Sequence, residues 1–410
     1  MKIDFKLNSQ KSWILCCFLN FLIASIMGLL LRFSYLFPLN VNYIYLLHAH
    51  SHVAMLGWTY MMIYILIIHF FVPNHKREKP IYNQLFWATE CVVIGMMIAF
   101  PVHGYGLFSI IFSTTHILLS YVFCWLVWKD AAADKTYNKR LLLISILFMV
   151  FSTFVVWCLG PAISTLGKQS AFYQIAIQFF LHFQFNGWFL VAVLALFLQQ
   201  FKGEINLKHF RIFQILLLIS ILLTVAFPVS WFVDMKILRW INACAVVLQL
   251  LAFVYFYKML KTQIKTFKAS LNSATKMVYG LAFSSLFLKI SLQLLVLLPC
   301  FTETLHQIRN FVIGFIHLTS LGVITGFLFG ILIQNKILSN QSYILRLGMK
   351  FFVLGYIATE ILLFLQGSFF YFNRGKLPRY YESIFAASCL IVSGLILIVT
   401  SIINKKTRVD

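Results

Sequence analysis

Residues 45–72 read YLLHAHSHVAMLGWTYMMIYILIIHFFV, an apolar run that contains four histidines and no Asp, Glu, Lys or Arg. A helix needs about 20 apolar residues to cross a bilayer, so this run predicts a membrane-spanning helix. The composition agrees, since 61% of the 410 residues are hydrophobic, 11% are charged and the mean hydropathy is +0.89. A soluble chain has about 25% charged residues. The chain is therefore predicted to be an integral membrane protein.

Eleven further runs of this kind bring the number of predicted spans to twelve. The spans are approximately 11–37, 45–72, 83–103, 106–128, 140–162, 171–200, 210–233, 238–259, 277–299, 310–335, 347–366 and 380–403. The first run is too long for the apolar core of a signal peptide and has no cleavage site, so we expect it to remain as a span. The segments between spans are short. The predicted fold is an all-α bundle of twelve transmembrane helices, a single domain over residues 1–410.

Basic residues are concentrated in every second loop and in the two terminal segments. Those regions hold 24 of the 33 Lys and Arg residues, and the other loops hold seven. By the positive-inside rule both termini are predicted to be cytoplasmic. The net charge of +22 then follows from topology, so we expect a lipid bilayer and no nucleic acid as a partner. The expected location is the bacterial inner membrane.

The eight cysteines fall mostly within apolar runs, and none forms a CxxC or CxxCH motif. This argues against a disulfide framework, a zinc ribbon and covalently attached c-type haem.

A histidine followed by a glycine five residues later recurs in spans 2, 6 and 10. The three copies are His52–Gly57, His182–Gly187 and His317–Gly322. A second motif, Ala-Phe-Pro-Val, occurs at 99–102 and again at 226–229. Coincidence among apolar strings is the alternative explanation. The two signals together predict three pseudo-repeats of four helices, at approximately 11–128, 140–259 and 277–403.

Four histidines are predicted to share one layer of the membrane. At 1.5 Å per residue, His52, His182 and His317 lie roughly 10–17 Å below the outer ends of their helices, and His116 lies at a similar depth. An interhelical hydrogen bond is the simpler role for any one of them. Ionisable residues inside a membrane are functional candidates, and convergent imidazoles can hold haem iron or copper.

The first span with histidines offers two different faces. His48 and His52 are four residues apart, so they share a helix face and are predicted to bind one metal together. His50 lies about 200° round the helix from that pair. The remaining histidines are expected in loops or at the membrane interface, and we exclude them from the site: His69, His75, His103, His209 and His306.

Four other charged residues lie within predicted spans. Arg32 is expected either to extend to the membrane surface or to pair with haem propionates. Glu90 is expected to form a structural salt bridge or to lie at the interface. Lys289 and Glu360 are expected near mid-membrane, as a buried ion pair or as steps in a proton path.

This pattern resembles subunit I of the haem–copper superfamily, the catalytic subunit of oxidases and nitric-oxide reductases. Residues 47–58, LHAHSHVAMLGW, are similar to a helix-10 segment of C-type oxidases, and 317–326, HLTSLGVITG, resemble helix 10 of that family and of the NnrS haem–copper membrane proteins. The resemblance implies a b-type haem held by His52 or His50 and by His317. It implies that His182 binds copper or faces the haem, together with His116.

The sequence also departs from that family. The span with Ala226-Phe227-Pro228-Val229 lacks the copper-binding histidine pair, and His317 is the only histidine of its span. We therefore expect one haem, with copper as a second candidate, in a protein that handles electrons or a diatomic gas such as nitric oxide or oxygen. An oxidoreductase activity stays open. The alternatives are a secondary transporter with a Lys289/Glu360 site and a non-catalytic partner of respiratory-chain subunits.

Overall fold

The computed structural model describes residues 4–132, 136–201, 203–298, 301, 307–338 and 342–404. Among the basic residues, cysteines and histidines considered above, the following lie outside these ranges: Lys2, Lys135, Lys202, Cys300, His306, Lys405, Lys406 and Arg408. Within the described ranges all regular structure is helical. Twelve of these helices are long and apolar enough to cross a membrane, and each overlaps one predicted span. The all-helical, twelve-span prediction is confirmed to this extent.

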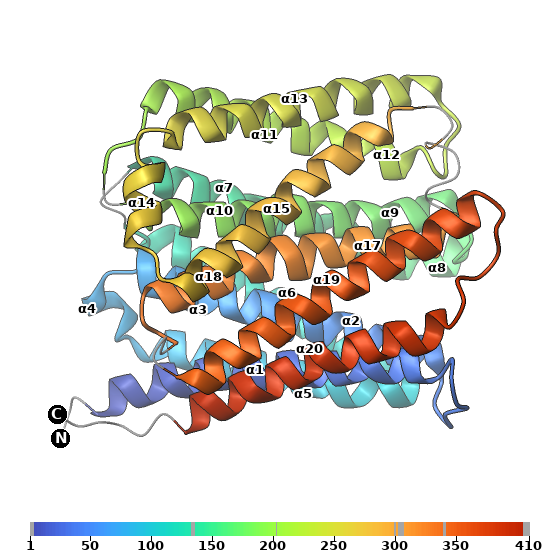
Figure 1. The fold of residues 1–410 in the computed structure, drawn as a ribbon, viewed down its shortest axis with the longest axis horizontal. Helices are drawn as coiled ribbons and strands as arrows, with labels where there is room; N and C mark the ends of the chain where they lie inside the picture. Colours follow the sequence, from blue (N-terminus) through green and yellow to red (C-terminus); the bar gives the residue numbers. More distant parts are fainter. Residues whose placement is uncertain are drawn as a thin grey trace. The chain divides into compact units, whose positions relative to one another are not determined.

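The helices group into two compact units, of which the first contains the described residues within 1–132, 277–281 and 328–410. Its elements are α1 (Asp4–Phe33), α2 (Tyr43–His52), η1 (Val53–Tyr60), α3 (Met61–Phe71), α4 (Asn74–Arg77), α5 (Pro80–His103), α6 (Leu107–Asp130), α19 (Tyr343–Tyr371) and α20 (Tyr380–Ile403). Helix α1 lies beside α20, and the start of α1 and the end of α20 lie at the same end of this unit (Figure 1).

The second unit contains the described residues within 133–276 and 282–327. Its elements are α7 (Thr136–Thr153), η2 (Phe154–Cys158), α8 (Leu159–Leu166), α9 (Ala171–His182), η3 (Phe183–Phe189), α10 (Leu190–Leu198), α11 (Leu207–Thr224), α12 (Ala226–Val229), α13 (Lys236–Leu260), α14 (Ile264–Ser270), α17 (Arg309–His317) and η4 (Leu318–Thr325). Two helices, α15 (Ser273–Leu295) and α18 (Gly326–Gln334), contribute residues to both units.

Aromatic side chains fill the core of each unit. In the first, Trp58 stacks on Phe21 with ring centres 4.4 Å apart and contacts Phe329 at 5.7 Å. In the second, Phe197 packs against Phe283 at 5.3 Å and Phe327 at 5.0 Å. Many large apolar side chains are instead exposed, among them Trp240 at 71%. Such exposure suits a surface that faces lipid rather than water.

Candidate functional site

The three repeated histidines occupy equivalent places in their helices. His52 ends α2, His182 ends α9 and His317 ends α17. Directly after each histidine the backbone adopts a π-helix, and these segments are η1, η3 and η4. The glycine of each motif lies buried inside its π-helix. Since π-helical turns are rare and frequent at functional sites, the motif marks three unusual points in the backbone.

The imidazole of His52 is oriented by two contacts within the first unit. Its Nδ1 lies 2.8 Å from the backbone oxygen of His48. A carbonyl oxygen can only accept, so Nδ1 carries the proton and the neutral ring has its lone pair on Nε2. The ring also stacks on Phe100 of α5 with centres 4.2 Å apart. Metal-binding histidines commonly donate one ring N–H to a carbonyl and bind the metal through the other nitrogen.

His48 and His50 face different neighbours. The His48 ring meets Tyr105 edge-on, with centres 4.7 Å apart, and the same tyrosine lies 5.9 Å from the His52 ring. His50 contacts α1 instead: its Nδ1 donates to the backbone oxygen of Ala24 at 2.8 Å. His50 and His52 therefore contact different helices, as the 200° rotation between them predicts.

The His50 ring depends on a glycine in α1. A Cβ placed on Gly28 would lie 2.9 Å from Cε1 of His50, closer than real Cβ atoms come. One turn further along α1, Arg32 donates to the backbone oxygen of Ile384 at 3.2 Å and to Oγ of Ser388 at 2.5 Å. Arg32 also interacts electrostatically with Glu360 of α19. These contacts join α1 to the last two helices of the chain.

His116 is the fourth predicted histidine of the layer. It lies in α6, only 3% exposed, and its ring meets the ring of Tyr60 edge-on with centres 4.8 Å apart. Its Nε2 has no hydrogen-bond partner among the described residues. His52 is near enough to act on it electrostatically. The structure thus brings His48, His52 and His116 into one neighbourhood of α2, α5 and α6.

His182 has a different hydrogen-bonding state. Its Nε2 donates to the backbone oxygen of Ile221 at 2.9 Å, and Nδ2 of Asn186 lies 3.5 Å from its Nδ1. Both ring nitrogens therefore face protein partners. A metal at His182 would require the ring to give up one of these contacts.

The other residues predicted within spans divide between the units. Lys289 belongs to the second, is fully buried, donates to Oε1 of Gln293 at 3.3 Å and has Phe315 5.2 Å from its Nζ. Glu360 belongs to the first, beside Arg32. A direct Lys289–Glu360 ion pair stays a prediction. So does haem ligation by His317, which is half-buried at the end of α17.

No group of three or more His, Cys, Asp and Glu side chains is arranged to hold a metal ion in the described ranges. A haem needs only one or two axial ligands from the protein. The imidazoles near His52 are enough for one or two ligands. They are the ring of His52, whose Nε2 carries the lone pair, and the rings of His48 and His116.

Two polar groupings were not predicted. Glu90 is 3% exposed and accepts a hydrogen bond from Asn20, so it is neither solvent-exposed nor salt-bridged within the described part of the chain. Asn20 and Glu90 lie 70 positions apart, so no local sequence signal links them.

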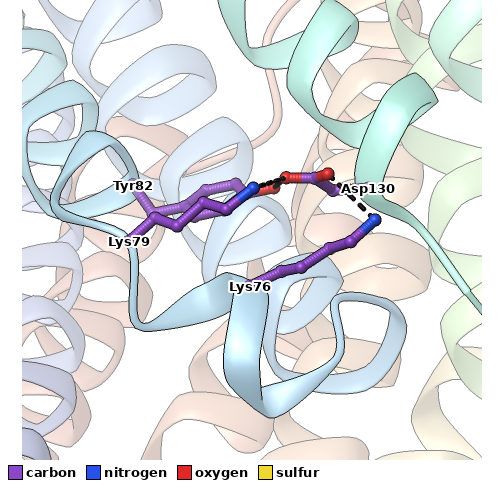
Figure 2. A network of polar contacts seen from close by, with 4 residues as sticks. All are labelled: Lys76, Lys79, Tyr82 and Asp130. Carbon is purple, nitrogen blue, oxygen red and sulfur yellow. Dashed lines mark hydrogen bonds and ion pairs between the residues drawn. The ribbon is translucent and has the colours of Figure 1, made fainter.

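The second unpredicted grouping surrounds Asp130, whose side chain is 2% exposed at the end of α6 (Figure 2). Lys76 Nζ lies 3.1 Å from Oδ1, Lys79 Nζ lies 3.5 Å from Oδ2, and the Tyr82 hydroxyl donates to Oδ2 at 3.1 Å. These contacts attach α4, the residue before α5 and the first turn of α5 to the end of α6. Lys76 and Lys79 belong to the basic residues that predict the topology, and they also join two parts of the structure through Asp130.

The chain matches no protein-family model, and no curated protein matches it significantly. Functional assignment therefore depends on the residues themselves.

Proposed function

We propose that the chain is a haem-binding integral membrane protein in which Nε2 of His52 would hold the iron. The observation that carries this proposal is the hydrogen bond from Nδ1 of His52 to the oxygen of His48, which leaves Nε2 with a lone pair. Phe100 stacks on the imidazole and sets the plane of the ring. When bound, the haem would supply one-electron chemistry or bind a diatomic gas.

Neighbouring residues have supporting roles in this proposal. His116, buried beside Tyr60, would offer a polar group near the site, since its Nε2 has no partner in the part of the chain that is described. Arg32 already has partners in α20, which favours a role in helix packing. His317 keeps the ligand role that the resemblance to haem–copper proteins implies. Copper stays a second candidate.

A repeated architecture is part of the same proposal. Each π-helix begins directly after one of the three repeated histidines. In each unit the helix with the Phe-Pro motif packs against the helix that carries a repeated histidine, α5 on α2 and α12 on α9. These parallels support pseudo-repeats related to subunit I of haem–copper oxidases. The shared end of α1 and α20 supports two termini on one side of the membrane, which we propose is the cytoplasmic side of a bacterial inner membrane.

The test is the absorption spectrum of the purified protein, with extraction of the pigment to identify its type. We expect a Soret band and non-covalently held haem b, because the chain has no CxxCH motif. Fully folded protein that stays free of haem when expressed with excess haem would contradict the proposal. That result would favour a non-catalytic partner of a respiratory complex.

Lys289 favours one second candidate, a secondary transporter. A fully buried ammonium whose identified hydrogen-bond acceptor is the neutral Gln293 is suited to bind an anionic solute, since charges inside membranes mark substrate paths. A screen of small anions by thermal stability separates the two functions. An anion that raises the thermal stability of the wild type but not of Lys289→Gln would support transport. If the protein is loaded with haem and no anion raises its thermal stability, the transporter candidate is excluded.

A further inference from the structure

Glu90 is a carboxyl group in the interior of the first unit. It lies ten residues after Pro80, hence roughly 15 Å along α5 from the first residue of that helix. Its Oε2 accepts a hydrogen bond from Nδ2 of Asn20 in α1 at 2.8 Å. The thiol of Cys16, one turn earlier in α1, is a second hydrogen-bonding partner. Both known partners are neutral.

No cation balances this carboxyl group in the described residues. The titratable groups near it are thiols, Cys16 and Cys17 of α1 and Cys91 of its own helix. The other elements in contact with α5, which include α2, η1, α3 and α6, bring no charged side chain to Glu90 in the parts described. A buried carboxylate without a cation is costly, and binding a proton removes that cost.

Asn20 connects this carboxyl group to the π-helix that follows His52. The same Nδ2 that donates to Glu90 also donates to the backbone oxygen of Gly57, at 3.2 Å. The next residue of α1, Phe21, stacks on Trp58, which follows Gly57. Asn20 and Phe21 of α1 thus contact Gly57 and Trp58 of η1.

We propose that Glu90 is an intramembrane proton-binding site, and that Asn20 links its charge to the π-helix η1. Loss of the proton would leave a carboxylate, which accepts a stronger hydrogen bond from the Asn20 amide than the neutral acid does. The NH2 group of Asn20 donates to both Glu90 and Gly57. A change in its bond to Glu90 should therefore change its bond to Gly57 in η1. The site needs no haem.

Infrared difference spectra of the protein in liposomes, recorded against pH, test this site. We expect a carbonyl band of a protonated carboxylic acid that is absent in Glu90→Gln and retained in the control Glu360→Gln. Asn20→Leu should shift the frequency of the band, because it removes the amide donor. Identical acid bands in the wild type and Glu90→Gln at every pH would overturn the proposal.

A second measurement uses the unmodified protein, in case Glu90→Gln fails to fold. A hydrophobic carbodiimide reacts with protonated carboxyl groups in apolar surroundings, and peptide mass mapping locates the label. We expect label on Glu90 that declines as pH rises, and none on the ion-paired Asp130. Protection of Glu90 by sodium at constant pH would overturn the proposal in favour of a metal-cation site. An unlabelled Glu90 in protein that also lacks the acid band would overturn it as well.

Discussion

The imidazole of His52 and the phenyl ring of Phe100 lie 4.2 Å apart between centres, with 28° between their planes. Phe100 is fully buried and directly precedes Pro101, which lies near the end of α5. The α5 helix thus sets the plane of the histidine, while the bond to His48 sets which nitrogen is free. A substitution at Phe100 should therefore affect the candidate ligand without removing it.

Phe100→Leu should lower the haem content per chain while leaving the protein folded. Leucine keeps most of the apolar volume, so the cost in stability should be about 1 kcal/mol, but it provides no flat face for the imidazole. Haem-to-protein ratios measure the effect. Phe213→Leu, a change at a buried phenylalanine of the second unit, is the control and should keep full haem content.

Gly57→Ala should destabilise the protein. A Cβ at this position would lie 2.9 Å from Cγ1 of Val93 and 3.1 Å from Cβ of Asn20, so a loss of about 1–3 kcal/mol is expected from overpacking. Thermal unfolding in detergent measures it. Gly280→Ala is the matched control, because no atom lies within 4 Å of its added Cβ. Equal stability of the two variants would show that η1 tolerates a side chain there.

His182→Ala should leave the haem content unchanged, because both ring nitrogens of His182 face Ile221 and Asn186. Iron and copper per chain, measured by mass spectrometry of the elements, check this expectation. Loss of copper alone would instead support the copper-ligand role that the resemblance implies. Loss of iron would contradict the assignment of His182 as a structural histidine.

Asp130→Ala should lower the free energy of unfolding by about 1.5–3 kcal/mol, the usual value for hydrogen bonds to a charged group. Lys76→Ala and Lys79→Ala should each cost less, because the lysines are partly exposed and each makes one of the three contacts. Denaturation followed by tryptophan fluorescence measures all three. A larger loss in either lysine variant would show that Asp130 is not the centre of this network.

The twelve spans could be predicted from the sequence because a bilayer imposes a length and an apolar composition on each helix separately. The opposed directions of His50 and His52 followed from helix geometry alone. The π-helices could not be predicted, since the spacing from His52 to Gly57 does not specify the hydrogen-bond register of the backbone. The Asn20–Glu90 contact depends on how α1 packs on α5, and the tautomer of His182 depends on the oxygen of Ile221. These are tertiary features without a local signal.

The central claim, that Nε2 of His52 binds haem iron, is tested most directly by one pair of spectra. His52→Ala and His50→Ala remove imidazoles from the same helix, and both rings donate Nδ1–H to a backbone oxygen. Purified at equal haem supply, His52→Ala is expected to lose most of its Soret absorbance, whereas His50→Ala keeps the band of the wild type. A full Soret band in His52→Ala, or loss of the band in His50→Ala alone, would contradict the assignment.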